Sequence, residues 1–407
     1  MSAVASLSRR ALLAGLGAAL SFPCPAVAQQ GPDADLWGAR DGYPVPPTPF
    51  AQQDGNPWPP KYRVGAFTHI DAIYKTNTVR RSSAPWMFKP AAATAPPSLV
   101  DDYLARNPVT GLLLVQDDRI LFERYQYARS DRDRFVSQSM VKSITGLLVG
   151  IAVSEGAIGS VDDPPEKYVD GFKGSEYGRT PIRDLLHMSS GVDFGEERDG
   201  GRDLSRLWAD MVAGLSGMGT IASITQFNKR IAQPGTRFRY ASIEPDVLGV
   251  VLRYATKESM SDYLQEKVWQ PIGAESEATW LVDAQGFDLA HFGFSAVLRD
   301  YVRLGRLLAH DGAWNGRQIL PRQWMLDATT VRASDSYLAP GTAMPYFGYG
   351  YLLWLLPGPR RQFAMVGDLG QRIIVDPPSK LVMVNTALDE KAGASWALWR
   401  KLVELFG

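Results

Sequence analysis

The hydrophobic pattern is most regular in the segment SQSMVKSITGLLVGIAVSEG, which begins at Ser137. Its apolar residues recur every three or four positions, the spacing that places side chains on one face of an α-helix, and Gly156 ends the run. The segment is therefore predicted to be a largely buried helix. The apolar positions are Met140, Val141, Ile144, Leu147, Leu148 and Ile151.

Strand patterns occupy both ends of the chain. From Thr110, TGLLLVQDDRILFERYQY has two apolar-rich runs joined by Asp117 and Asp118, which predicts an antiparallel hairpin. Beyond residue 345, short apolar runs separated by Gly and Pro turns predict further strands, and residues 393–407 predict an amphipathic helix. The runs beyond 345 are YFGYGYLLWLL, QFAMV, QRIIVD and KLVMVNTAL.

Helical patterns dominate the middle of the chain. TPIRDLLHM, with Pro181 near its start, predicts a short helix, and IEPDVLGVVLRYAT, SMSDYLQEKVWQPIG and SAVLRDYVRLGRLLAH predict longer ones. Strands from the two chain ends most economically share one antiparallel sheet, with the final helix over one face. We therefore expect an α+β fold with a mostly helical lobe, about residues 160–290, beside the sheet. A cleft between the two is the default place for a site.

The N-terminal segment has the features of an export signal. A twin arginine, Arg9 and Arg10, precedes an apolar run over residues 11–22, and the small-residue pattern Ala-Val-Ala ends at Ala28. These features predict a twin-arginine-type signal, residues 1–28, cleaved after Ala28, and hence a periplasmic protein. The apolar run is too short to remain as a stable membrane anchor. Residues 29–95 contain Pro- and Gly-rich stretches and are predicted to form an irregular extension over the surface.

Charge and cysteine content exclude several classes of function. Lysine and arginine together number 43, as do aspartate and glutamate, so the formal net charge is zero. A neutral chain has no general electrostatic attraction to nucleic acid or to an anionic membrane. The single cysteine, Cys24, lies within the predicted signal. The mature chain would thus lack disulfides, thiol catalysis and cysteine-ligated zinc.

Several familiar catalytic motifs are missing from the sequence. There is no Gly-x-Ser-x-Gly elbow, no HExxH and no P-loop. The histidines stand far apart without metal-ligand spacing, so we interpret them as structural, and we expect neither a metal ion nor an organic cofactor. The four histidines are His69, His187, His291 and His310.

Ser139 and Lys142 form the chain's only Ser-x-x-Lys pair. Positions i and i+3 share one helix face, so the lysine can reach the serine hydroxyl and act as the base that this weak nucleophile needs. At a helix start, the serine N–H can also stabilise an oxyanion, while the helix dipole disfavours a protonated lysine. A solvated pair on a surface helix is the alternative. The surrounding apolar positions favour the catalytic interpretation.

A second candidate is Tyr240, which with Ser242 opens another predicted helix in RFRYASIEPDVLGVVL. A tyrosine at a helix entry could pass protons between a nucleophile and a leaving group. Ser242 would point to the same side and could bind substrate. Taken alone, a tyrosine packed at a helix entry is the simpler interpretation.

In order along the chain, these motifs resemble the serine hydrolases related to class C β-lactamases, in which Ser-x-x-Lys is a known signature. TPIRDLLHMSSGVDF, GFSAVLRDYVRLGRLL and FAMVGDLGQRIIVDPPSKLVMV resemble further family segments, so the likeness covers about residues 96–407. The Tyr-x-Ser variant and the Gly-x-x-Gly-Gln strand look most similar to 6-aminohexanoate-dimer hydrolases and related carboxylesterases. The resemblance implies the β-lactamase and penicillin-binding-protein fold.

Carried over to this sequence, the resemblance implies that Ser139 is acylated, that Lys142 accepts its proton and that Tyr240 serves the leaving group. Ser242 would bind substrate or join the hydrogen-bond network, and a backbone N–H near Asp368 would complete the oxyanion hole. The acidic stretch GVDFGEERDGG, residues 191–201, either rims the cleft, where it could contact an amine, or is a solvated loop.

One motif departs from the family pattern. The family's Lys/His-Thr-Gly falls on residues 365–367, where Met365 replaces the cation and only Gly367 is retained, leaving room for a substrate. β-Lactamase and D-alanyl peptidase substrates both carry a carboxylate, so this loss counts against them. The resulting prediction is a serine hydrolase of a small linear amide or ester. A β-lactamase or D-alanyl-D-alanine peptidase is the enzymatic alternative, and a non-catalytic ligand-binding relative is the other.

Overall fold

The large sheet of the fold contains strands from both ends of the chain, as predicted. The computed structural model describes residues 30–47, 58–91, 96–196, 202–390 and 393–407, so the predicted signal lies outside the described residues. Its strands are β2 (Lys89–Pro90), β3 (Val109–Gln116), β4 (Arg119–Tyr125), β10 (Gly348–Tyr349), β11 (Trp354–Leu355), β12 (Phe363–Gly367), β13 (Gln371–Asp376) and β14 (Leu381–Ala387). Their order is β10-β11-β12-β13-β14-β3-β4-β2, antiparallel except for the parallel pair of β2 and β4.

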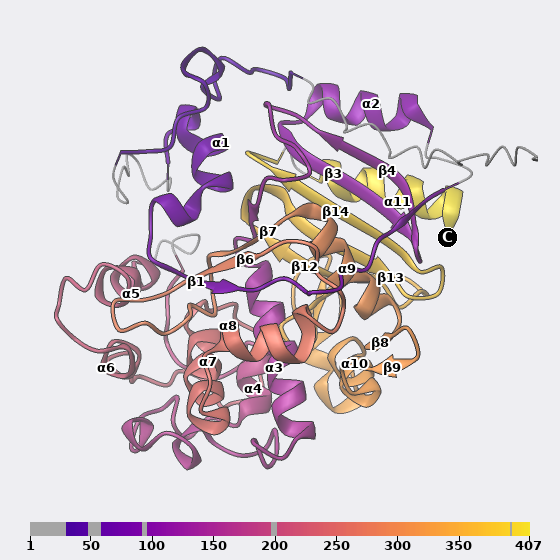
Figure 1. Cartoon of the computed structure of the whole chain (residues 1–407). Helices are drawn as coiled ribbons and strands as arrows, with labels where there is room; N and C mark the ends of the chain where they lie inside the picture. Colours follow the sequence, from indigo (N-terminus) through magenta and orange to yellow (C-terminus); the bar gives the residue numbers. More distant parts are fainter. Residues whose placement is uncertain (1–29, 48–57, 92–95, 197–201, 391–392) are drawn as a thin grey trace, which may run out of the picture.

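The central strands are buried because helices cover both faces of this sheet. In β3, Leu112 and Leu114 pack into one core and Leu113 and Val115 into the other, as the alternation of a strand requires. Helices α2 (Pro97–Arg106) and α11 (Ala394–Phe406) cover the first face, and α3 (Met140–Ser154) and α9 (Leu298–Ala309) cover the second (Figure 1). The predicted α+β architecture is confirmed.

The helical lobe lies beside the second face of the sheet, below it in Figure 1. Its longest helix, α7 (Ile243–Thr256), packs directly against α3. Its other helices are α4 (Ile182–Leu186), α5 (Asp203–Met211), α6 (Thr220–Thr225) and α8 (Met260–Leu264), which continues as the π-helical turn η6 (Gln265–Trp269). Helix α10 (Arg322–Ala328) and the hairpin of β8 (Ala313–Trp314) and β9 (Arg317–Gln318) follow α9.

A second, four-stranded sheet joins the N-terminal extension to the segment before α3 and to the strands that follow the helical lobe. It contains β1 (Thr76–Val79), β5 (Phe135–Val136), β6 (Ala278–Leu281) and β7 (Phe294–Ala296), in the order β1-β6-β7-β5. Strand β5 runs directly into the segment before α3, where the N–H of Ser137 donates to the carbonyl of Phe294 at 2.7 Å. The sheet therefore fixes the approach of the chain to Ser139.

The N-terminal extension differs from the irregular surface segment that its composition predicts. It contains helix α1 (Pro60–Thr68) as well as β1, and Trp58 is 2% exposed. The guanidinium of Arg63 donates to the carbonyl of Leu388 at 3.0 Å, which attaches α1 to the end of β14. The proline content predicted irregular structure here, but Pro60 occupies the first turn of α1, where a missing N–H costs nothing.

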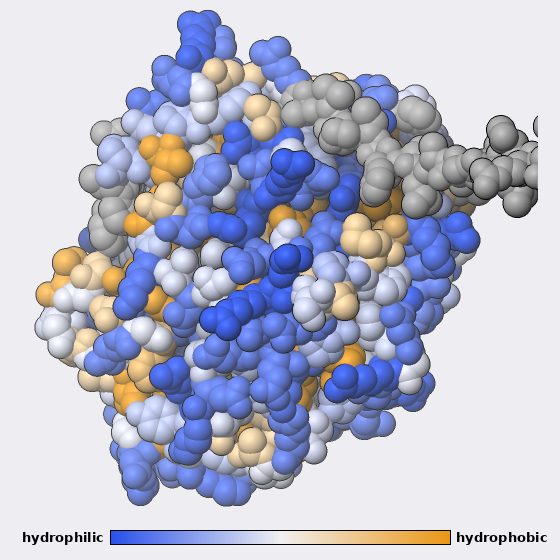
Figure 2. Space-filling view, in the orientation of Figure 1, coloured by the Kyte–Doolittle hydropathy of each residue, from blue (hydrophilic) through white to orange (hydrophobic). Residues whose placement is uncertain are grey.

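The surface shown in Figure 2 is largely hydrophilic, and its apolar residues form small separate patches. No helix in the described part of the chain is both long enough and apolar enough to cross a membrane.

Candidate active site

Ser139 lies at the N-cap of α3, directly after a tight change of chain direction. Gln138 has a left-handed φ of 48°, and the N–H of Met140 donates back to the carbonyl of Ser137 at 3.1 Å. A non-glycine residue in this conformation costs on the order of 1 kcal/mol and is common where a fold holds a reactive group. The turn presents the Ser139 hydroxyl at the helix start. Nothing in the sequence pattern indicates the strain at Gln138.

Lys142 contacts Ser139 directly. Its Nζ donates to the Ser139 Oγ at 2.7 Å and to the backbone carbonyl of His291 at 2.9 Å, and the residue is 2% exposed. Within the described residues, no carboxylate lies within 4.0 Å of this nitrogen. The lysine thus donates to a serine hydroxyl and a backbone carbonyl, both uncharged.

The ring of Tyr240 faces Lys142 and links the helical lobe to the large sheet. Its ring centroid is 5.2 Å from the Nζ of Lys142, and the ring stacks on Trp354 of β11 with centroids 5.7 Å apart. The structure therefore brings Ser139, Lys142 and Tyr240 together, although they span about a hundred residues of sequence. Trp354, which the sequence analysis did not identify, is the residue of the large sheet that packs against Tyr240.

Ser242 is the N-cap of α7 and is buried. Its backbone N–H donates to a carboxylate oxygen of Glu196, which belongs to the predicted acidic stretch. An acidic group at this end of a helix is favourable because it meets the positive end of the dipole. Glu196 thus caps α7 beside the site, whereas residues 197–201 of the stretch lie outside the described residues.

Strand β12 brings Gly367 against the segment that leads to Ser139. A β-carbon at Gly367 would lie 2.3 Å from the carbonyl oxygen of Ser137 and 2.8 Å from the β-carbon of Gln138. The glycine is therefore required by the chain's own packing and not only by an approaching substrate. Met365, two residues earlier, is fully buried in the core, while Asp368 just beyond is exposed.

Two histidines of the lobe have different surroundings. His187 is buried at the end of α4 and packs on Tyr351 with ring centroids 4.9 Å apart, and burial lowers the pKa of its imidazole to about 4. His291 hydrogen-bonds through Nδ1 to Asp246 at 2.7 Å and offers its carbonyl to Lys142. Asp246 is thus linked to Lys142 through His291. The sequence did not indicate this link, because Asp246 and His291 are 45 residues apart and no motif joins them.

In the part of the chain that the structure describes, no three or more His, Cys, Asp or Glu side chains are grouped to hold a metal ion. The groups that meet at the start of α3 are instead a hydroxyl, a lysine without a carboxylate and a phenol. They can support attack by serine on a carbonyl carbon, with proton transfer through the lysine.

The chain matches the Beta-lactamase family model over residues 98–402, and it therefore belongs to the β-lactamase family. It is a serine hydrolase of that family. A curated relative, the 6-aminohexanoate-dimer hydrolase of Paenarthrobacter ureafaciens, is 26% identical over 332 residues, which cover 79% of this chain and 84% of the relative.

Solved structures agree with this fold. A Bacillus anthracis protein provisionally assigned as a 6-aminohexanoate-dimer hydrolase has a TM-score of 0.74 at 21% identity, covering 88% of this chain and 95% of that protein. A family VIII carboxylesterase has a TM-score of 0.59 at 15% identity, covering 77% of this chain and 99% of the esterase.

Proposed function

We propose that the chain hydrolyses a small linear amide or ester through an acyl-enzyme on Ser139. The observation that carries the proposal is the 2.7 Å contact between the Ser139 hydroxyl and Lys142, a buried lysine that faces no carboxylate within the described residues. The similarity to an amide hydrolase and to a carboxylesterase supports this choice of substrate.

In the first step, Lys142 takes the hydroxyl proton as the Ser139 oxygen attacks the carbonyl carbon, forming a tetrahedral oxyanion. The amide of Ser139 and a backbone N–H near Asp368 would stabilise that charge. Tyr240, 5.2 Å from Lys142 measured at its ring centre, would pass the proton to the departing amine or alcohol as the bond to the carbonyl carbon breaks. Water then attacks the carbonyl carbon of the acyl-enzyme ester. The bond to the Ser139 oxygen breaks, the carboxylic acid product leaves, and a proton from the water returns to Ser139.

The strand β12 supports a substrate without a carboxylate at this position. Met365 is fully buried, so a lysine there would be a buried cation, and the adjacent valine offers no hydroxyl. The alternative, a β-lactamase or D-alanyl-D-alanine peptidase, requires that cation or a substitute for it. Turnover of nitrocefin, or a stable penicillin adduct on Ser139, would favour this alternative.

A fluorophosphonate label followed by peptide mass spectrometry tests the nucleophile. We expect the label on Ser139 of the wild type and none in Ser139→Ala. Ser143→Ala is the matched control, because Ser143 is buried one turn further along α3 and bonds the carbonyl of Leu352. Label at another residue, or equal labelling of Lys142→Ala, would contradict the proposal.

A substrate panel separates the remaining possibilities. p-Nitrophenyl esters, short ω-amino-acid amides and nitrocefin are compared on wild type and on Ser139→Ala. We expect ester or amide turnover that is lost in the variant. Binding without turnover of any substrate would identify the non-catalytic ligand-binding relative instead.

We further propose that the enzyme is exported and acts in the periplasm, on the basis of the twin arginine at Arg9 and Arg10. N-terminal sequencing of the protein recovered from the periplasmic fraction should begin at Gln29. An Arg9→Lys, Arg10→Lys double variant should remain in the cytoplasm. Equal export of this variant would contradict a twin-arginine signal.

A further inference from the structure

The second partner of the base is a backbone carbonyl. Lys142 Nζ donates to the oxygen of His291 at 2.9 Å as well as to Ser139. A carbonyl only accepts hydrogen bonds, so one N–H of a neutral lysine must point at it. The nitrogen lone pair is then available to the serine hydroxyl proton. After proton transfer, the ammonium can donate to both oxygens, so the position of this carbonyl matters at each stage.

A buried carboxylate holds that carbonyl in place. One oxygen of Asp246 accepts from the N–H of Ala290 at 3.0 Å, and the other contacts Nδ1 of His291 at 2.7 Å. Asp246 and His291 are 3% and 4% exposed, so neither bond competes with bulk water. The carboxylate therefore holds both the backbone before His291 and its ring, which leaves the His291 carbonyl little freedom to turn.

Helix α7 places this carboxylate relative to the other catalytic groups. Asp246 lies in the first turns of α7, the helix whose entry carries Tyr240, and α7 packs on α3, which carries Ser139. The ring of His291 also meets Trp208 edge to face, with centroids 5.9 Å apart. Helix α7, whose entry carries Tyr240, thus also determines the position of the His291 carbonyl through Asp246.

We propose that Asp246 and His291 are positioning residues for Lys142, acting together to hold the His291 carbonyl against the amine. The inference rests on the proposed function, in which Lys142 is the base. Truncating Asp246 should release the 290–291 backbone and let the lysine leave the serine. The expected result is a loss in the chemical step with little change in substrate binding.

The test uses the full-length enzyme and two readouts, kcat and KM on a p-nitrophenyl ester, and the rate constant for fluorophosphonate labelling of Ser139. Asp246→Ala should lower kcat and the labelling rate by about 30- to 100-fold while KM changes less than about threefold. Asp246→Asn should recover most of the loss, because its amide can serve both neighbours if the histidine changes tautomer. His291→Ala, which keeps the carbonyl, should lose about tenfold.

A double-mutant cycle separates positioning from a general structural role. In a Lys142→Met background, Asp246→Ala should have no further effect on the labelling rate, because no base remains to be positioned. A loss of the same size in both backgrounds, or an unchanged kcat in Asp246→Ala, would overturn the proposal. If Asp246→Ala does not fold, His291→Ala decides by the same cycle.

Asp288→Ala is the matched control. Asp288 is a buried carboxylate of the same lobe that accepts from the N–H of Ser261 at 3.0 Å and from Asn77 at 2.9 Å, without contact to Lys142. This variant should lose stability but keep its kcat per folded molecule. If Ser139→Ala retains activity, the proposed function itself fails; if activity depends on Ser139 but not on Asp246 or His291, only the positioning role fails.

Discussion

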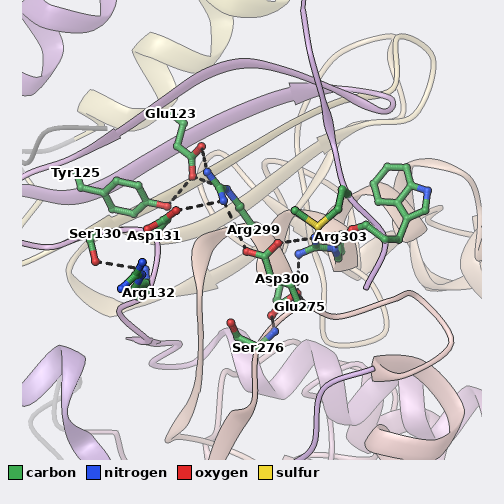
Figure 3. A network of polar contacts seen from close by, with 12 residues as sticks. Glu123, Tyr125, Ser130, Asp131, Arg132, Glu275, Ser276, Arg299, Asp300 and Arg303 are labelled. Carbon is green, nitrogen blue, oxygen red and sulfur yellow. Dashed lines mark hydrogen bonds and ion pairs between the residues drawn. The ribbon is translucent and has the colours of Figure 1, made fainter. Parts of the chain in front are cut away.

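Two buried basic side chains of this molecule have opposite surroundings. Arg303 on α9 is fully buried and donates to carboxylate oxygens of Asp300 and Glu275, both at 2.7 Å, and to the carbonyl of Trp86 at 2.9 Å (Figure 3). Lys142 is nearly as buried but faces a hydroxyl, a carbonyl and an aromatic ring. Burying a charge is tolerable when it is paired, so the arginine is a fixed part of the fold. The lysine contacts no acid within the described residues, as expected for the base of the proposed mechanism.

The network around Arg303 extends this contrast. In Figure 3, Arg299 forms a two-pronged pair with Glu123, both contacts at 2.9 Å, and approaches Asp131 at 3.2 Å. These contacts join α9 to β4 and to the segment after it. Through Trp86, the network also reaches the N-terminal extension and attaches this part of it to α9. Matched charges here connect elements, whereas Lys142 contacts no carboxylate within the described residues and is the proposed base.

Replacing each cation by methionine, which keeps an unbranched chain of similar length, measures this difference directly. Lys142→Met should lower kcat by about 10³-fold or more, because the serine loses its base. Its free energy of unfolding should fall by less than about 1 kcal/mol or rise, since a buried polar amine is replaced by an apolar group of similar length. Steady-state kinetics and urea unfolding check both. A stability loss as large as that of a core truncation would show that Lys142 is structural.

Arg303→Met should have the opposite effect. The change leaves the buried Asp300 and the partly buried Glu275 without this cation, which costs about 3–5 kcal/mol of unfolding free energy when one partner of a buried pair is removed. The kcat per folded molecule should remain within about twofold of the wild type. Urea unfolding and kinetics at a temperature where the variant is folded provide the measurement. A kcat loss without a stability loss would remove the distinction between the two cations.

The sequence predicted the main elements, and the pairing of Ser139 with Lys142, because both depend on local spacing. Helix α3 follows from apolar periodicity, and Ser139 and Lys142 follow from three-residue separation on that helix. The resemblance to the β-lactamase family then placed Tyr240 beside them. By contrast, Asp300 and Arg303 lie in a segment matched to a family motif, yet their ion pair became visible only in the structure.

Long-range pairings could not be predicted in the same way. Strand β1 pairs with β6 across about two hundred residues, and its four-residue length carries little pattern of its own. The contact of Asp246 with His291 joins a helix to a loop, and any buried acid near any buried histidine would look identical in sequence. Gly367 was recognised, but its close approach to Ser137 depends on how β12 meets the turn before α3.

Glu244 is another buried ionisable group, and unlike Arg303 it contacts no opposite charge among the described residues. It accepts a hydrogen bond from the Ser190 hydroxyl at 2.6 Å, while its second oxygen is buried without a partner among the described residues. Burial raises the pKa of its carboxyl to about 8, although the bonds from Ser190 oppose this shift. The folded protein thus keeps a proton that the unfolded chain loses near pH 4.5.

Glu244→Gln should therefore change how stability depends on pH. In the wild type, this group lowers the free energy of unfolding progressively between about pH 4.5 and 8, because the unfolded state releases the proton first. The variant should be close to the wild type at pH 5 and more stable by roughly 2–3 kcal/mol at pH 7. Urea unfolding of both proteins across this range provides the difference. Parallel curves would show that Glu244 is ionised when folded.

Ser242→Ala should have the smallest effect of these changes. The Ser242 backbone N–H, which bonds to Glu196, survives the substitution, so the cap of α7 and the free energy of unfolding should change little. Its hydroxyl has no hydrogen-bond partner within the described part of the chain, which leaves it available to a substrate. Losing one such bond should raise KM about five- to tenfold, equivalent to roughly 1 kcal/mol, with kcat nearly unchanged. An unchanged KM together with a lower free energy of unfolding would instead show that this hydroxyl, like Arg303, stabilises the fold.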